Sequence, residues 1–278
     1  MAIEITPLGA DVGLHITGVS GSGLLAPEVV DEIRRGIDER VVVVIRRAAI
    51  SDDDLVALSG MLGTVVVRRA GGLPDHPEVE AISLDPAASA LADYQRGTFF
   101  WHTDGTTSDE LPQKITLLTA IETADAGGDT EFANGYAAYE ALSDEDKDLC
   151  RGLQVVHSFA AAQILADPEP TDRQRAIWER VPPRVHPLVW TRRSGRRSLL
   201  IGATAGEVVG WPADESRALL DRLLAWTTQP RFVVHHRWEK GDLVIWDNTG
   251  ALHRAWPYTA TSRRLMHRTT LAGEEAVA

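Results

Sequence analysis

The chain has little cysteine, few aromatic residues and no long apolar run. Cys150 is the only cysteine among 278 residues, so no disulfide can form within the chain, as is typical of proteins from a reducing compartment. No stretch approaches the roughly 18 apolar residues that a membrane-spanning helix needs. The first residues, MAIEITPLGADVG, lack both the charged start and the apolar segment of a secretory signal. We therefore expect a cytoplasmic protein that does not bind membranes.

Positive charge is also scarce. The chain holds 40 Asp and Glu against 28 Lys and Arg, which gives a formal net charge of −12. Nucleic-acid-binding proteins usually carry a basic face, so this balance disfavours DNA or RNA as a partner. An anionic ligand must then be captured by individual arginines rather than by the overall field of the protein. There is no internal repeat, and we expect residues 1–278 to form a single domain.

The pattern of apolar residues predicts many short strands with helices between them. The β-branched run from Val41 to Ile45 is typical of a buried strand, and Ser51 can cap the helix that follows it. Further strands are expected at 3–5, 12–19, 99–104, 114–121, 130–133, 184–190, 198–201, 231–237, 242–247, 251–256 and 263–271. Further helices are expected at 27–39, at 135–150 with a break near Ser143, around 174–180, and at 212–226.

Strands in both halves of the chain, with helices outside them, predict a mainly β fold with flanking helices. The expected core is a double-stranded β-helix, also called a jelly roll. The segment around 135–182 is expected to be a helical insertion. Residues 71–98 are rich in Gly, Pro and Ala, and we expect them to form a mobile loop beside the active site.

One short run, FWHTDGT, contains two side chains that could bind a metal. His102 and Asp104 are two residues apart, and on an extended strand they would point to the same face. His253 follows a predicted strand and a tight turn far downstream, which would place it on a neighbouring strand. Two imidazoles and one carboxylate can hold one face of an Fe(II) ion and leave its other positions open. The sequence therefore predicts an iron site made by these three residues.

Other histidines could compete for the third position. His235 and His236 are rivals, but they lead into a polar turn rather than follow a strand. His267 is better interpreted as a residue of the core or one that supports the site. His157 stays ambiguous.

Two arginines near the end of the chain suggest an anion-binding site. Arg264 and Arg268 are four residues apart on a predicted strand, so they share a face with Met266, whereas Arg263 faces the other way. Guanidinium groups inside a barrel need anionic partners, and their planar geometry suits a bidentate grip on a carboxylate. The hydroxyl of Thr130 could donate to the same carboxylate as Arg264.

Seven segments in this order resemble the taurine/alkylsulfonate and 2,4-dichlorophenoxyacetate dioxygenase family, known as the TauD/TfdA type. They are ITPLGADVG, VVVVIRR, FWHTDGT, GGDTEFANGYAAYEAL, HPLVWTRRSGRRSLLIG, HHRWEKGDLVIWDNTGALHRAWPY and SRRLMHRTTLAG. The match spans nearly the whole chain, and an ordered series of this kind is far more specific than any single motif. Residues 71–98 carry no recognisable family pattern.

The resemblance implies an Fe(II)- and 2-oxoglutarate-dependent dioxygenase. In such an enzyme, oxidative decarboxylation of 2-oxoglutarate with O₂ is coupled to hydroxylation of a C–H bond in a small anionic substrate, with fragmentation to an aldehyde where the new hydroxyl is unstable. The resemblance assigns the metal to His102, Asp104 and His253. It assigns the distal carboxylate of 2-oxoglutarate to Arg264 and Thr130.

The resemblance also implies where the substrate lies. Arg268 and the backbone N–H of Gly105 match positions that meet the substrate anion in sulfonate-oxidising members. Those members carry a His, shortly followed by a Tyr, before the metal-binding run, whereas this chain has VVRRAG at 66–71. Arg68 or Arg69 in this place implies a carboxylate, sulfate or sulfonate on a carbon frame other than taurine. Thr98, with Tyr94 and Gln95, could line the pocket.

Several alternatives stay open at this point. The same cofactors serve desaturation or decarboxylation of amino-acid derivatives, including isonitrile formation. A jelly-roll zinc hydrolase could use the same three ligands, but it would need a general base and would leave Arg264 and Thr130 without a task. A cupin-like binding module without turnover is a third possibility. Members of the family are often dimers or tetramers, and no sequence feature defines an interface.

Overall fold

The computed structural model describes residues 3–67, 71–108 and 111–277. The strands are β1 (Glu4–Pro7), β2 (Leu14–Thr17), β3 (Val42–Ile45), β4 (Glu80–Ile82), β5 (Ile115–Glu122), β6 (Thr130–Asn134), β7 (Gln154–His157), β8 (Arg184–Pro187), β9 (Val189–Thr191), β10 (Arg197–Leu199), β11 (Ala205–Val208), β12 (Val233–His236), β13 (Leu243–Asp247), β14 (Ala251–Ala255) and β15 (Leu265–Thr270). The helices are α1 (Pro27–Arg40), α2 (Asp52–Leu62), α3 (Gly135–Glu140), α4 (Asp144–Cys150), α5 (Phe159–Ala166), α6 (Asp172–Trp178) and α7 (Ala213–Thr227), with 3₁₀ turns η1 (Gly21–Leu25), η2 (Ala92–Phe99) and η3 (Pro230–Phe232).

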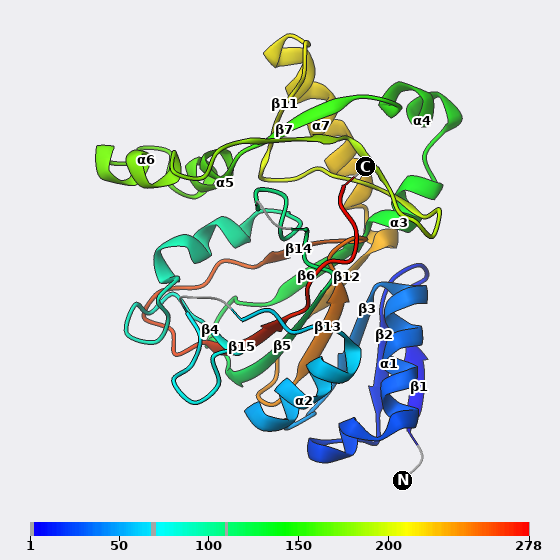
Figure 1. Cartoon of the computed structure of the whole chain (residues 1–278), viewed down its shortest axis with the longest axis vertical. Helices are drawn as coiled ribbons and strands as arrows, with labels where there is room; N and C mark the ends of the chain where they lie inside the picture. Colours follow the sequence, from blue (N-terminus) through cyan, green and yellow to red (C-terminus); the bar gives the residue numbers. More distant parts are fainter. Residues whose placement is uncertain (1–2, 68–70, 109–110, 278) are drawn as a thin grey trace.

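Seven strands form the large sheet, in the order β1-β2-β3-β13-β5-β15-β4 (Figure 1). Along β3 and β13, successive side chains point to opposite faces. One face, with Val43 and Ile245, packs under α1 and α2, and the other, with Val44 and Trp246, packs against the second sheet. β3 is buried on both faces, which explains why its sequence is continuously apolar.

The second sheet has three strands, in the order β12-β6-β14, and it faces the large sheet. Phe132 of β6 is fully buried between the two sheets, where its ring lies 5.1 Å from that of Trp246. Two facing sheets with flanking helices confirm the predicted jelly-roll class. Candidate site residues come from both sheets, because Thr130 of β6, His253 of β14 and Arg268 of β15 line one cavity.

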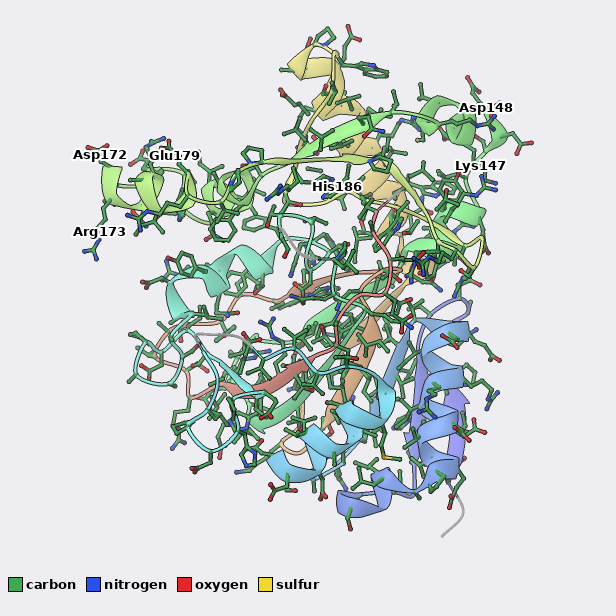
Figure 2. The ribbon with its side chains drawn as sticks, viewed as in Figure 1. Lys147, Asp148, Asp172, Arg173, Glu179 and His186 are labelled. Carbon is green, nitrogen blue, oxygen red and sulfur yellow. The ribbon has the colours of Figure 1, made fainter. Side chains whose placement is uncertain are left out.

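A separate layer covers one end of the sandwich (Figure 1). It combines α3 to α7 with a three-stranded sheet, β11-β7-β8, and a hairpin, β9-β10. Leu219, Leu220 and Leu223 of α7 are buried in its core. Asp172 and Arg173 point outward from the end of α6, and His186 lies on the side that faces the two main sheets (Figure 2). The segment 135–182 therefore contains the three expected helical pieces, which are α3, α4 and α6. It also contains α5 and β7, which were not expected.

Two expectations need correction. Residues 99–104 are not a strand: η2 ends at Phe99, and within 99–104 only His102 forms a β-bridge, to His253. The segment 71–98 is not an irregular loop, because it contains β4 and most of η2. Its Gly and Pro content hid the short apolar strand at 80–82. Among the described residues, no helix is long and apolar enough to cross a membrane.

Candidate active site

Two remote segments meet at the predicted metal site. His253 lies on β14, and its backbone exchanges two hydrogen bonds with His102, at 3.0 and 2.9 Å between N and O. Asp104 lies in the turn that follows, so a change of chain direction rather than strand alternation brings its carboxylate back toward the two rings. The backbone at Gly202 packs directly against the segment that carries His102: Gly202 has φ of +109°, and a Cβ there would lie 2.4 Å from the carbonyl oxygen of Trp101.

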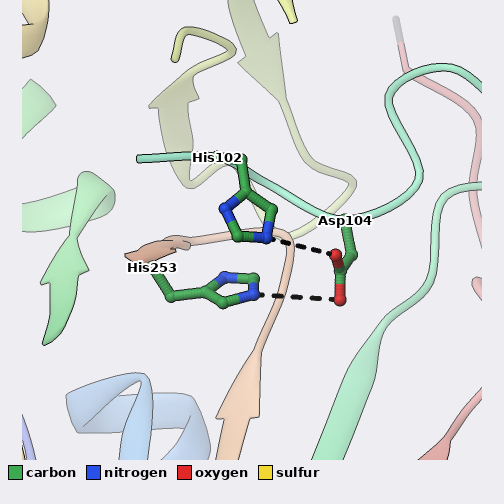
Figure 3. Close-up of side chains that lie close together, drawn as sticks. All are labelled: His102, Asp104 and His253. Carbon is green, nitrogen blue, oxygen red and sulfur yellow. Dashed lines mark ion pairs between the residues drawn. The ribbon is translucent and has the colours of Figure 1, made fainter. Parts of the chain in front are cut away.

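The three side chains converge in space (Figure 3). Nε2 of His102 lies 3.7 Å from one carboxylate oxygen of Asp104, and Nε2 of His253 lies 3.9 Å from the other. The three ligating atoms are all within 4.8 Å of one another. Nδ1 of His102 donates to the carbonyl of Phe100 at 2.8 Å, which leaves the Nε2 lone pair facing Asp104. The structure therefore brings the predicted ligand set together.

The electrostatics of the site also suit a cation. Burial lowers the pKa of His253 to about 3, with further lowering by His102 and Arg268 that outweighs the opposing effect of Asp104. The imidazole is therefore neutral at pH 7 and has a lone pair to offer. Two imidazole side chains and one carboxylate form a donor set that fits a divalent transition metal.

A narrow cavity extends from the two histidines to Arg264 and Thr130. Arg264 is 4% exposed; its Nε donates to the carbonyl of Gly128 at 3.1 Å, and its guanidinium lies 4.8 Å from the ring of Tyr258. Among the described residues, no carboxylate forms an ion pair with it. Burial lowers the pKa of Arg264, an effect that Tyr258 and Asp129 oppose. A buried guanidinium held by neutral groups fits a ligand that supplies the missing negative charge.

Thr130 is oriented by a neighbour that sequence reasoning missed. The indole Nε1–H of Trp238 donates to the Thr130 hydroxyl oxygen at 2.9 Å, and both side chains are buried. Since the oxygen already accepts, the hydroxyl proton is available for an acceptor on the cavity side. Thr130 and Arg264 line the same cavity, and the sequence-based expectation that both donate to one carboxylate stays a prediction.

Arg268 lies inside the sandwich, but it has a partner that was not foreseen. Nε and Nη2 of Arg268 donate to one carboxylate oxygen of Glu80, at 3.0 and 2.8 Å. Burial alone would lower the pKa of Arg268, but the carboxylates of Glu80 and Asp104 outweigh it and raise this pKa. Arg268 lines both the narrow cavity and a wider one next to it.

The wider cavity carries the remaining predicted substrate residues. Gly105 has φ of +87° in the turn after Asp104, and Thr98 lines both cavities and donates to the carbonyl of Gln95 at 2.6 Å. Tyr94 lines the wider cavity, and Gln95 lines the narrow one. Arg68 and Arg69 lie outside the described residues.

A hydrogen-bonded chain supports the turn after Asp104 from the covering layer. Nδ1 of His157 is hydrogen-bonded to the hydroxyl of Thr204 at 2.9 Å, and that hydroxyl is bonded to the hydroxyl of Thr106 at 3.0 Å. Nε2 of His186 donates to the carbonyl of Thr106 at 2.9 Å. His157 and His186 lie on adjacent strands, β7 and β8. The ambiguous His157 is therefore part of the support of the site.

The other histidines lie away from the three predicted ligands. His235 forms an ion pair with Asp129 at 2.8 Å, on the outer face of the second sheet, β12-β6-β14. His236 is buried beside Asp242, at 3.2 Å. His267 bonds to Asp52 of α2 at 2.7 Å, so it ties the large sheet to that helix.

Comparison with known proteins identifies the family. The model of the taurine catabolism dioxygenase TauD, TfdA family matches residues 4–270. An alpha-ketoglutarate-dependent 2,4-dichlorophenoxyacetate dioxygenase from Burkholderia sp. (strain RASC) is 35% identical, over 93% of this chain and 91% of the relative. An alpha-ketoglutarate-dependent sulfate ester dioxygenase from Pseudomonas putida is 29% identical, over 100% of this chain and 92% of the relative.

Solved structures agree with the sequence comparison. The crystal structure of AAD-2 in complex with Mn(II) and N-oxalylglycine superposes with a TM-score of 0.81 and 29% identity, over the full length of both chains. A taurine dioxygenase from Burkholderia xenovorans gives a TM-score of 0.78 with 30% identity, over 99% of this chain and 90% of that one. The chain belongs to the TauD/TfdA family of alpha-ketoglutarate-dependent dioxygenases.

Proposed function

We propose that this dioxygenase uses Fe(II), 2-oxoglutarate and O₂ to hydroxylate a C–H bond in a small anionic substrate, such as an aryloxy acid, a sulfate ester or a sulfonate. The observation that carries the proposal is one continuous set of groups: three metal-ligating side chains, a buried Arg264 at one end of the narrow cavity, and Arg268 between that cavity and the wider one. When bound, iron and 2-oxoglutarate supply the oxidising chemistry.

The side chains of this protein bind and orient the reactants. His102, Asp104 and His253 would hold the metal by one face. Arg264 and Thr130 would hold the distal carboxylate of 2-oxoglutarate. This would position the keto-acid end of 2-oxoglutarate near the metal. Arg268 and the N–H of Gly105 would hold the anionic end of the substrate at the mouth of the wider cavity, so positioning is the main contribution of the protein.

The names of the relatives support this class of substrate. Relatives are named for 2,4-dichlorophenoxyacetate, for (S)-phenoxypropionate and for sulfate esters, all of which are small anions. Hydroxylation of a CH₂ group next to an ether or sulfate oxygen gives an unstable product, which breaks its C–O bond to release a phenol or sulfate and leaves an aldehyde. We propose the same outcome here.

A substrate screen tests this proposal. Purified protein with Fe(II) and 2-oxoglutarate is assayed for succinate and for aldehyde with aryloxyacetates, alkyl sulfates, small sulfonates and N-substituted amino acids. We expect at least one aryloxy acid, sulfate or sulfonate to raise succinate formation at least tenfold over the rate without substrate, with an equal amount of aldehyde. Stimulation by amino-acid derivatives alone, without aldehyde, would overturn the proposal.

A further inference from the structure

Glu80 is a buried acid directly opposite Arg268. The two residues are register partners on the antiparallel strands β4 and β15, so their side chains share the inner face of the sheet. Glu80 is 3% exposed as a residue, and the side chain of Arg268 is 17% exposed. Nη2 of Arg268 lies 2.8 Å from a carboxylate oxygen of Glu80. They therefore form a fixed ion pair in the wall of the site.

The ion pair with Glu80 uses only part of the hydrogen-bonding capacity of the Arg268 guanidinium. A single oxygen of Glu80 takes a hydrogen bond from Nε and another from Nη2. Among the described residues, Nη1 of Arg268 has no hydrogen-bond partner, and Arg268 lines both cavities next to the metal ligands. Nη1 and the second proton of Nη2 can therefore donate to a substrate, with an orientation that Glu80 sets.

The negative charge of Glu80 has a second effect. An anion that approaches Arg268 is attracted by the guanidinium and repelled by the carboxylate behind it, so the pair presents hydrogen-bond donors with a weakened net charge. Neutral acceptors, such as an amide or ester carbonyl, lose less than anions do, since a dipole responds to a nearby charge more weakly than an ion does. We propose that Glu80 is a specificity-determining residue that lowers the preference of Arg268 for anions over neutral acceptors. The proposal rests on the proposed function in one respect, namely that Arg268 meets the substrate.

The test compares two probes of the same shape and different charge. Wild-type protein and E80Q are loaded with Mn(II) and N-oxalylglycine, and binding of phenoxyacetate and of 2-phenoxyacetamide is measured by titration calorimetry. Glu80→Gln keeps an oxygen that accepts from Arg268 and removes the charge. We expect E80Q to bind phenoxyacetate at least tenfold more tightly than wild type, a difference of about 1.4 kcal/mol, and to bind the amide within twofold of wild type.

Two controls separate this effect from a general one. Glu122→Gln removes an equal charge from β5, where Glu122 forms an exposed ion pair with Lys240, and it should change neither affinity. In R268M, the further change Glu80→Gln should no longer favour the acid. The role of Glu80 would be overturned if the affinities of E80Q for both probes changed equally, or if its affinity for phenoxyacetate did not rise. Binding of neither probe to E80Q counts as no rise.

Failure of the proposed function would look different. If the wild-type protein did not bind Mn(II) with N-oxalylglycine, or did not form succinate from 2-oxoglutarate, the function itself would be wrong. Suppose instead that the wild-type protein binds Mn(II) with N-oxalylglycine and forms succinate. If the ratio of the affinities for phenoxyacetate and 2-phenoxyacetamide is then the same in wild type and E80Q, only the role of Glu80 is wrong.

Discussion

The indole N–H of Trp238 donates to the hydroxyl oxygen of Thr130 across 2.9 Å, inside the sandwich. This bond decides which way the hydroxyl proton can point. Without it, the Thr130 hydroxyl is free to rotate and to accept rather than donate. Trp238 thus acts on the residue that we propose binds the cosubstrate, and it is not one of the proposed metal ligands.

Replacement of Trp238 by Phe should weaken 2-oxoglutarate binding. The ring remains and only the N–H is lost, so we expect the KM for 2-oxoglutarate to rise about two- to tenfold, as for the loss of one hydrogen bond of about 0.5–1.5 kcal/mol. The kcat should change by less than twofold. Succinate formation at varied 2-oxoglutarate measures both constants.

The control for this variant is another indole, which is partly buried. Trp226→Phe removes an N–H that donates to the carbonyl of Ala138, in the covering layer, and should leave the KM unchanged. In T130V, the further change Trp238→Phe should add nothing, because the hydroxyl it orients is gone. Additive effects of the two changes would contradict this coupling.

Arg264→Gln should weaken 2-oxoglutarate binding more strongly. Hydrogen bonds to a charged group contribute about 1.5–3 kcal/mol, so the KM for 2-oxoglutarate should rise about 10- to 150-fold. Arg263→Gln is the matched control, since Arg263 is the exposed neighbour. The same succinate assay gives the two constants. An unchanged KM in R264Q would show that the cosubstrate carboxylate binds elsewhere.

The elements that position the site follow largely from local pattern. The strand predicted at Val41 to Ile45 is β3, shorter by one residue because Val41 ends α1 in a left-handed conformation with φ of 69°. The ligand set was also found from residue type and spacing. The expectation that Asp104 lies on a strand is wrong, however, because Asp104 lies in a turn.

Contacts between remote segments could not be predicted in the same way. Glu80 in the apolar stretch VEAI signals a buried acid, but its partner Arg268 is 188 positions away. The pairing depends on the register of β4 against β15, which no local pattern encodes. Likewise, the indole of Trp238 reaches Thr130 only because β12 pairs with β6 just before it.

Metal binding should stabilise the protein through the three converging side chains. A ligand that binds only the folded state raises its stability in proportion to the logarithm of concentration over Kd. Mn(II) at about 100 times Kd should therefore add about 2.7 kcal/mol and raise the Tm by a few degrees. In H102A and in H253A this rise in Tm should be lost. H235A should keep it, because His235 lies on the outer face of the second sheet, away from the three side chains. Differential scanning fluorimetry measures the shift, and an equal rise in H102A would exclude His102 as a ligand.

His157 should make the stability of the metal-free protein depend on pH. Burial, with a smaller effect of His186, lowers the pKa of His157 to about 3, against 6.5 in the unfolded chain. The unfolded state therefore takes up a proton as the pH falls below about 6.5, while the folded state does not until about 3. Stability due to the neutral imidazole is thus complete above pH 6.5 and is lost toward pH 3, at up to about 1.4 kcal/mol per pH unit. In H157Q, which keeps a polar group toward Thr204, the slope between pH 6 and pH 4.5 should be smaller than in wild type by up to that amount. Urea unfolding at several pH values measures it, and equal slopes in the two proteins would mean that His157 takes up its proton in the folded state.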